Sequence, residues 1–190
     1  MSEQAYIPLS TPLLSGRERE YVLDCVDTTW ISSVGKYVQD FERNFAAYVK
    51  TPGAVACSCG TAALHLALLC AGVRPGDGVF VPALTFIAPV NAISYVGAVQ
   101  IFCDSEEQSF GLSPESVESY IADNCSFDGE VLIDKSSGRK ISAIIPVHLM
   151  GRACDMDKFI ALAAKYRLKL IEDAAEGIGC LYKGRHVGSF

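Results

Sequence analysis

The sequence predicts an α/β fold in which a mostly parallel sheet is sandwiched by helices. The first observation is that short runs at residues 78–81, 99–103 and 141–147 are apolar almost throughout. Strands covered on both faces show such continuous apolar runs, whereas half-exposed strands alternate polar and apolar residues. The second observation is that segments with helical periodicity separate these runs, which keeps neighbouring strands parallel. Turn residues, as at 72–77, lie between the elements.

The N-terminal part is expected to be an extended arm to Pro12, followed by amphipathic helices at residues 16–28 and 36–50. Apolar side chains recur at helical spacing in the second helix, for example Phe41 and Phe45. Trp30 lies between the two helices and is expected to pack against both. We therefore predict two parts, namely an N-terminal arm with helices over residues 1–50 and an α/β domain over residues 51–190.

The α/β domain is predicted to alternate strands and helices in chain order. We expect strands at 54–57, 78–81, 99–103, 141–147 and 168–172, and helices at 61–71, 86–95, 114–121 and 156–166. Residues 125–140 interrupt this rhythm, because glycines flank the apolar run Val131-Leu132-Ile133. That pattern predicts a hairpin inserted before a core strand.

Composition excludes several classes of function. The net charge is −6 and the chain has no run of Lys or Arg, so neither a nucleic-acid partner nor a membrane surface is expected. Two stretches without formal charge, at 51–73 and 78–103, contain proline, glycine and polar residues that disfavour a spanning helix. Eight dispersed cysteines suit buried thiols in a reducing compartment, and the first residues show no secretory signal. A cytoplasmic location is expected.

A carboxylate follows the last predicted strand. Asp173 comes directly after the run Leu170-Ile171-Glu172. Open α/β sheets bind ligands beyond the carboxyl ends of their strands, so Asp173 is a candidate binding residue. The alternative is a structural cap, because Asp often caps the helix or turn that follows it.

A possible anion site lies at the start of the predicted helix 61–71. Gly60 and Thr61 follow a strand-like run, and the open N–H groups and dipole of a helix start favour an anion. An ordinary N-cap by Ser58 or Thr61 is equally compatible with these residues. No Walker lysine and no G-x-G-x-x-G turn are present, which excludes a P-loop and disfavours a nicotinamide oxidoreductase.

Neither a metal centre nor an acid–base histidine is expected. Cys57, Cys59 and His65 are close in sequence, but a structural zinc site usually needs four ligands. His65 lies in an apolar helix and is expected to be a buried core histidine. His148 follows an apolar strand and is expected to pack or hydrogen-bond rather than to transfer protons.

Phe86 adds an aromatic ring after the next predicted strand, at a position equivalent to the anion site and the acid. An anion holder, a flat ring and a carboxylate suit a phosphorylated heteroaromatic cofactor. The helix start would hold the phosphate, Phe86 would stack on the ring, and Asp173 would pair with a ring nitrogen. Pyridoxal 5′-phosphate (PLP) has these features, and a carboxylate at its ring nitrogen strengthens the ring as an electron sink.

A series of motifs, in order along essentially the whole chain, resembles the DegT/StrS-type sugar aminotransferases. The resemblance implies a fold-type I aminotransferase large domain, a homodimer with shared active sites, and transfer of an amino group from glutamate to a keto group of a nucleotide-linked sugar. The motifs are Trp30-Ile31-Ser32-Ser33-Val34-Gly35, Gly60-Thr61-Ala62-Ala63-Leu64-His65, Pro75-Gly76-Asp77, Pro82-Ala83-Leu84-Thr85-Phe86, Pro146-Val147-His148-Leu149-Met150-Gly151, Glu172-Asp173-Ala174-Ala175-Glu176, Tyr182-Lys183-Gly184-Arg185 and Val187-Gly188-Ser189-Phe190.

The resemblance also implies roles for individual residues. Gly60 and Thr61 match positions that hold the cofactor phosphate, Phe86 matches the ring that stacks on the pyridine, and Asp173 matches the partner of the ring nitrogen. Glu176 falls beside the cofactor, where many relatives have Gln. This variant is similar to the branch that makes 4-amino-4,6-dideoxy sugars for surface glycans, with pyridoxamine 5′-phosphate (PMP) as an intermediate. Residues 127–139 look like a subset that acts on UDP-linked N-acetylated sugars.

The family's Schiff-base lysine follows the motif that ends at Phe190, and it is not among residues 1–190. Neither Lys36 nor Lys183 matches its position. The resemblance therefore implies a large domain that is incomplete at its C-terminus, and we expect no transaminase activity from these 190 residues alone. Two alternatives stay open: a PLP-dependent sugar dehydratase with His at the lysine position, and a non-catalytic paralogue that binds a partner subunit.

Overall fold

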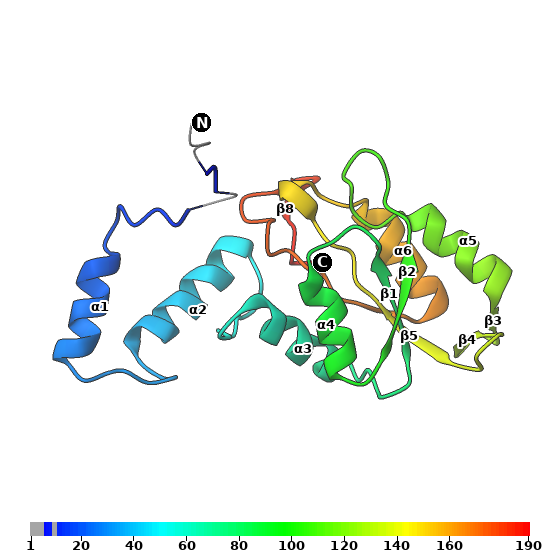
Figure 1. Ribbon diagram of the computed structural model, residues 1–190, viewed down its shortest axis with the longest axis horizontal. Coiled ribbons are helices and arrows are strands. Elements are labelled where there is room, and N and C mark those ends of the chain that lie inside the picture. The colour runs from blue at the N-terminus through cyan, green and yellow to red at the C-terminus, as the bar shows by residue number, and fades with distance from the viewer. Residues whose placement is uncertain (1–5, 9–10) are drawn as a thin grey trace, which may run out of the picture.

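The computed structural model describes residues 6–8 and 11–190, and a mixed six-stranded sheet forms its centre (Figure 1). The parallel strands are, in spatial order, β2 (Val99–Cys103), β1 (Gly78–Pro82), β5 (Lys140–Ile144) and β6 (Lys169–Leu170). β4 (Leu132–Asp134) pairs antiparallel with the start of β5, and β3 (Cys125–Phe127) pairs with β4. The prediction of an α/β fold with a mostly parallel sheet is confirmed.

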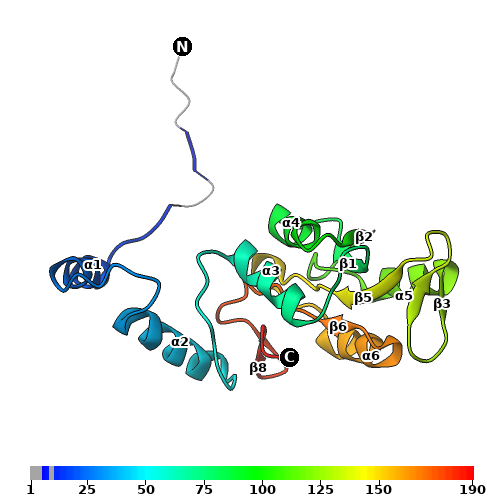
Figure 2. The same cartoon turned by 90° about the horizontal axis from the view of Figure 1, so that it is seen from below.

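Helices cover both faces of this sheet (Figure 2). α3 (Gly60–Cys70) and α4 (Ile87–Tyr95) share one buried cluster with Val79 and Val81 of β1. α5 (Pro114–Asn124) and α6 (Met156–Tyr166) share the other cluster with Phe80. Successive side chains of a strand point to opposite faces, so β1 contributes to both cores and is buried along its whole length.

One predicted strand is absent, and the strands predicted at 141–147 and 168–172 are shorter than expected, since they end as β5 at Ile144 and as β6 at Leu170. Residues 54–57 form no strand, because the N–H of Ala56 donates to Glu42 of α2 at 2.8 Å rather than to a neighbouring strand. β5 ends at Ile144, before Pro146, which has no N–H to donate to a ladder. Backbone pairing nevertheless resumes further on, since Asp173 N–H donates to Pro146 O and His148 N–H donates to Asp173 O, both at 3.0 Å.

The segment 125–140 forms the antiparallel pair β3–β4, with Cys125 opposite Asp134 and Phe127 opposite Leu132. This pair is an extension of the central sheet, because Leu132 of β4 is also in register with Ile141 of β5. β4 and β6 therefore lie on the same side of β5, β4 beside its beginning and β6 beside its end.

The N-terminal helices α1 (Glu18–Asp27) and α2 (Lys36–Val49) lie to one side of the sheet (Figure 1). α1 contains no buried residue. Trp30 lines a cavity together with residues of both helices, but it is 59% exposed and does not make the buried contact between them that was predicted. Tyr37 makes this contact instead, since its hydroxyl donates to Asp24 at 2.8 Å and its ring lies 4.7 Å from that of Tyr21.

The C-terminal part returns to the sheet through the 3₁₀ turn η1 (Leu149–Gly151), α6 and β6, and it ends with a hairpin formed by β7 (Leu181–Tyr182) and β8 (Arg185–His186). His186 closes this hairpin, because its Nε2 accepts the N–H of Gly179 at 2.9 Å. Within residues 6–8 and 11–190, no helix has both the length and the apolar character needed to cross a membrane.

Candidate functional site: a cavity at the carboxyl edge of the sheet

A cavity of about 250 Å³ lies beyond the carboxyl ends of the parallel strands. Four of the five residues predicted to bind a cofactor line it: Gly60, Phe86, Asp173 and Glu176. Thr61 does not line the cavity; it is half-buried next to Gly60 in the first turn of α3. The fold thus gathers residues separated by more than a hundred positions, because β1 and the strand that leads to Asp173 end at the same edge.

The start of α3 presents N–H groups that no side-chain oxygen caps. Cys59, and not Ser58 or Thr61, occupies the N-cap position, in an extended conformation and without a capping hydrogen bond from its side chain, so the alternative of an ordinary cap by Ser58 or Thr61 is not formed. The Cys59 thiol lies at this turn, where the N–H of Ala62 and the hydroxyls of Ser58 and Thr61 lower its pKa. A Cβ at Gly60 would meet no heavy atom within 4 Å, which leaves open space beside the first turn. Both features suit an anion at this helix start.

Phe86 immediately precedes α4 and its backbone is extended. The side chain is 70% exposed although it is a large apolar ring. An exposed phenyl group that also lines a cavity offers a free face on which a flat heteroaromatic ring can stack.

Asp173 is 8% exposed, and its Oδ1 accepts the N–H of Ala175 at 3.2 Å. Burial raises the pKa of the Asp173 carboxyl, and the nearby Glu176 adds to the rise, while the Ala175 N–H and His148 oppose it. In the part of the chain that the structure describes, Asp173 makes no ion pair with Lys or Arg. A buried carboxylate of this kind is stabilised by a cationic ligand group, such as a protonated ring nitrogen.

Glu176 reaches across the cavity to the loop that follows β5. Its Oε2 accepts the N–H of Met150, a residue with a left-handed φ of 53° in the η1 turn. The side chain thus fixes the loop that carries Leu149, which lines the cavity together with Glu176. Its place beside the other candidate residues is compatible with contact to a cofactor or substrate.

His148 is fully buried and uses both ring nitrogens, which confirms the prediction that it is a hydrogen-bonding residue. Nδ1 accepts the N–H of Cys154 at 3.1 Å, and Nε2 lies 3.0 Å from Glu172 Oε2. The prediction that His65 is a core histidine is wrong. It lies half-buried on α3, edge-on to Tyr95 at a ring-centroid distance of 5.8 Å.

Sequence reasoning missed Glu172, a buried carboxylate next to Asp173. Its side chain is only 5% exposed and contacts His148 and the C-terminal segment. The available signal was its position, because the residue before Asp173 in an extended strand must point to the opposite face. Across the described ranges, no three His, Cys, Asp or Glu side chains are grouped as metal ligands would be.

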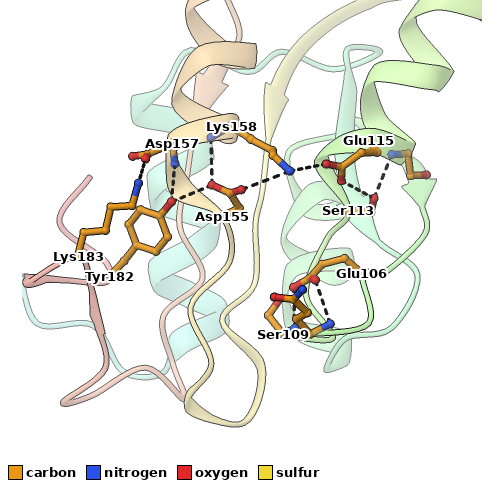
Figure 3. A network of polar contacts seen from close by, with 11 residues as sticks. Glu106, Ser109, Ser113, Glu115, Asp155, Asp157, Lys158, Tyr182 and Lys183 are labelled. Atoms are coloured by element: carbon orange, nitrogen blue, oxygen red, sulfur yellow. Dashed lines mark hydrogen bonds and ion pairs between the residues drawn. The ribbon is translucent and has the colours of Figure 1, made fainter.

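A larger cavity of about 470 Å³ lies between α5, α6 and β7, and charged side chains dominate its lining (Figure 3). These charges contact one another. Lys158 contacts Glu115 at 2.5 Å and Asp155 at 3.4 Å, and Tyr182 donates to Asp155 at 2.8 Å. Lys183 pairs with Asp157 on the surface, where both side chains are exposed. We assign no ligand to this cavity.

Comparison with known proteins yields a consistent match. The profile of the DegT/DnrJ/EryC1/StrS aminotransferase family matches residues 12–190. The chain is 43% identical over 189 residues to GDP-perosamine synthase of Caulobacter vibrioides. The matched region covers 100% of this chain and 47% of that relative. Thus the chain spans about half the length of the curated relatives it matches.

Solved structures share the fold. The aminotransferase of Psychrobacter cryohalolentis superposes with a TM-score of 0.79 at 33% identity, over 95% of this chain and 42% of that one. NtdA of Bacillus subtilis, solved with bound cofactor PMP, superposes with a TM-score of 0.72 at 32% identity, over 87% of this chain and 35% of that one.

Proposed function

The chain belongs to the DegT/DnrJ/EryC1/StrS aminotransferase family, and from this premise we propose that the whole protein is a PLP-dependent nucleotide-sugar aminotransferase. It transfers an amino group from glutamate to C4 of a nucleotide-linked 4-keto-6-deoxy sugar, and so supplies a precursor of surface glycans. The observation that carries the proposal is the single cavity lined by Gly60, Phe86 and Asp173.

The residues around the cavity fit PLP and its amino form, PMP. The uncapped first turn of α3, with Gly60 and Thr61, would hold the phosphate, and the exposed face of Phe86 would cover the ring. The Asp173 carboxylate would face the ring nitrogen and hold a proton there. The resulting positive charge would in turn stabilise the buried, negatively charged carboxylate. Glu176, which lines the same cavity, would also contact the cofactor. When bound, the cofactor supplies an electron sink for the carbon that gains or loses the amino group.

The identity of the sugar nucleotide is the finer part of the proposal. The name of the Caulobacter vibrioides relative contains GDP, whereas the resemblance of residues 127–139 suggested a UDP-linked sugar. We favour a GDP-linked substrate, because the similarity to that relative extends over 100% of the chain. The segment 127–139 includes parts of β3 and β4, which extend the sheet edge by pairing with β5, so its position has a structural explanation that involves no substrate.

The test is an amino-donor assay on the whole protein with glutamate and a set of GDP- and UDP-linked 4-keto-6-deoxy sugars. The proposal expects turnover with at least one GDP-linked keto sugar, measured as 2-oxoglutarate release and as the amino-sugar product. Absence of turnover with every keto sugar would reject the aminotransferase assignment. Turnover with UDP-linked sugars alone would reject only the choice of nucleotide.

The proposed partner is a second copy of the protein. Large apolar side chains are exposed along the N-terminal part, including Leu13 at 82%, Leu14 at 77% and Ile31 at 75%. An apolar surface of this kind is typical of a protein–protein contact. We propose that residues 1–50 form an arm and helices that bind the partner subunit, while residues 51–190 form the cofactor-binding domain.

A further inference from the structure

Glu172 makes contacts for which the proposed cofactor chemistry has no use. Oε2 accepts the N–H of Gly188 at 2.8 Å and lies 3.0 Å from His148 Nε2, while Oε1 accepts the N–H of Phe190 at 2.7 Å. One buried carboxylate therefore receives three donors, two of them from a backbone segment that is remote in sequence. Hydrogen bonds to an ionised, buried acceptor are among the stronger ones in proteins.

The direction of the His148 contact is fixed by its other nitrogen. The N–H of Cys154 donates to Nδ1 at 3.1 Å, so Nδ1 carries no proton and Nε2 donates to Glu172. His148 is fully buried and its backbone N–H bonds to Asp173 O. The His148 ring thus links the Glu172 carboxylate to the segment that follows β5. The backbone of that segment pairs in turn with Asp173.

The segment held by Glu172 forms a wall next to the proposed cofactor cavity. Val187 and Gly188 line a further cavity of about 350 Å³. Gly60 and Asp173 line both this cavity and the proposed cofactor cavity of about 250 Å³. The packing is close, because a Cβ at Gly177 would lie 2.6 Å from Val187 Cγ2. The placement of residues 187–190 therefore sets the shape of the space around Asp173.

We propose that Glu172 is a positioning residue for the cofactor site. Its carboxylate holds Gly188 and Phe190 against the strand end, while the next residue, Asp173, points to the opposite face and meets the cofactor. The inference rests on the proposed function, since the ligand is PLP or PMP. Without the carboxylate, residues 187–190 leave this position for part of the time, and cofactor affinity falls by the fraction of protein that stays competent.

The test compares the wild-type protein with Glu172→Gln and Glu172→Asp. Glutamine keeps the volume but has a single acceptor oxygen, so its amide group faces at least one of the three donors. Aspartate keeps the charge but is one methylene shorter. The matched control is Glu118→Gln on α5, which removes an exposed ion pair with Lys165 of α6. The measurements are amide hydrogen exchange at Gly188 and Phe190 with and without PMP, PMP affinity by calorimetry, and circular dichroism to verify folding.

We expect exchange at both amides to rise about tenfold or more in Glu172→Gln, and PMP to bind about tenfold more weakly. Because binding and ordering are reciprocally linked, PMP should slow exchange at these amides more in the variant than in the wild type. Glu172→Asp should fall between the two, and it decides the question if the Gln variant does not fold. Glu118→Gln should match the wild type.

Two results would overturn the inference. Unchanged exchange at Gly188 and Phe190 would show that Glu172 does not hold the segment. Faster exchange with unchanged PMP affinity would show that the segment has no bearing on the cofactor. Failure of the wild type to bind PMP would instead reject the proposed cofactor site, and the exchange rates would still show whether the carboxylate holds residues 187–190.

Discussion

At the scale of single residues, folding and ligand binding place different demands on the side chains that line the cavity. Gly60 is the clearest case, because a methyl group there would meet nothing in the protein but would project into the space proposed for the phosphate. Asp173 is the opposite case, since its burial is unfavourable for the folded chain until a cationic group binds. Substitutions at these two positions should therefore have different effects on stability and on affinity.

The first prediction concerns Gly60→Ala. We expect the thermal midpoint to stay equal or to rise slightly, because alanine favours a helix over glycine by up to about 1 kcal/mol and no clash opposes it. PMP affinity should fall about tenfold or more as the methyl group displaces the phosphate. Calorimetric titration and thermal melts measure both effects. Unchanged PMP affinity would place the phosphate elsewhere.

The second prediction concerns Asp173→Asn. A carboxyl with a raised pKa binds protons more tightly when folded, so its ionisation lowers stability as the pH rises through its normal value towards the raised one. At pH 7 without cofactor the Asn variant should thus be at least as stable as the wild type. At acid pH, below the normal carboxyl pKa, this advantage should disappear. The variant should lose most of the stabilisation that PMP gives the wild type, as followed by thermal melts across pH.

At the scale of elements, two tight contacts outside the cavity join segments around the sheet. Asp134 ends β4, where its side chain accepts hydrogen bonds from the hydroxyls of Ser136, Ser137 and Tyr120 at 2.7–2.8 Å. Gly111 lies in the loop between β2 and α5, where a Cβ would be 2.5 Å from Cys154 Sγ and 2.8 Å from Val147 O. The first contact depends on charge and the second on space.

The third prediction follows from the charge of Asp134. The hydroxyls of Ser136, Tyr120 and Ser137 hold the pKa of this carboxyl well below its usual range. Its contribution to stability is therefore present above a pH of about 4 and is lost as the pH falls towards the depressed value. Asp134→Asn should cost about 2 kcal/mol at pH 7 and progressively less below pH ~4, as measured by urea unfolding. A pH-independent loss would contradict this explanation.

The fourth prediction concerns Gly111→Ala. The added methyl group would press on a backbone carbonyl, which cannot turn away as a flexible side chain can. We expect a loss of about 2 kcal/mol in the free energy of unfolding. The control is Gly53→Ala, where a Cβ meets nothing within 4 Å and the change should be within about 0.5 kcal/mol. Equal effects at the two sites would argue against close packing at Gly111.

At the scale of the whole molecule, the N-terminal part is the least buried region that the structure describes. α1 buries no residue, and exposed apolar side chains continue through Trp30 and Ile31. In Figure 1, α1 and α2 extend to one side of the sheet, and α1 does not pack against it. A partner subunit would bury these side chains, and such burial is the usual source of dimer stability.

The fifth prediction tests this surface. Ile31→Glu should weaken self-association about tenfold or more, because a charge would replace a large apolar side chain at the interface. The control is Ile160→Glu on α6, a 41% exposed position on the other face of the sheet from α3 and α4. Sedimentation at several concentrations measures both variants. A wild type that stays monomeric at all concentrations would reject the proposed dimer.

Patterns within the sequence gave the fold class because they reflect local burial. The runs at 78–81 and 99–103 are strands, and the periodic segment 156–166 is a helix, since continuous apolar runs and helical spacing have direct structural meanings. The run at 54–57 was wrongly predicted to be a strand. A strand needs a neighbouring strand to bond with, and here the N–H of Ala56 donates to the side chain of Glu42 instead. Trp30 misled because burial depends on what lies opposite, which its own neighbours do not reveal.

The sequence by itself predicted the order of most strands and helices and four residues of the cavity, because Gly60, Phe86 and Asp173 lie at the ends of recognisable elements and the family resemblance pointed to Glu176. Only the tertiary structure decided that Thr61 is off the cavity wall, that no side-chain oxygen caps α3, and that Glu172 holds Gly188 and Phe190. The physical reason is that a hydrogen bond between remote segments requires donor and acceptor to meet in a specific geometry. That geometry arises from the packing of the whole sheet, and no local pattern encodes it.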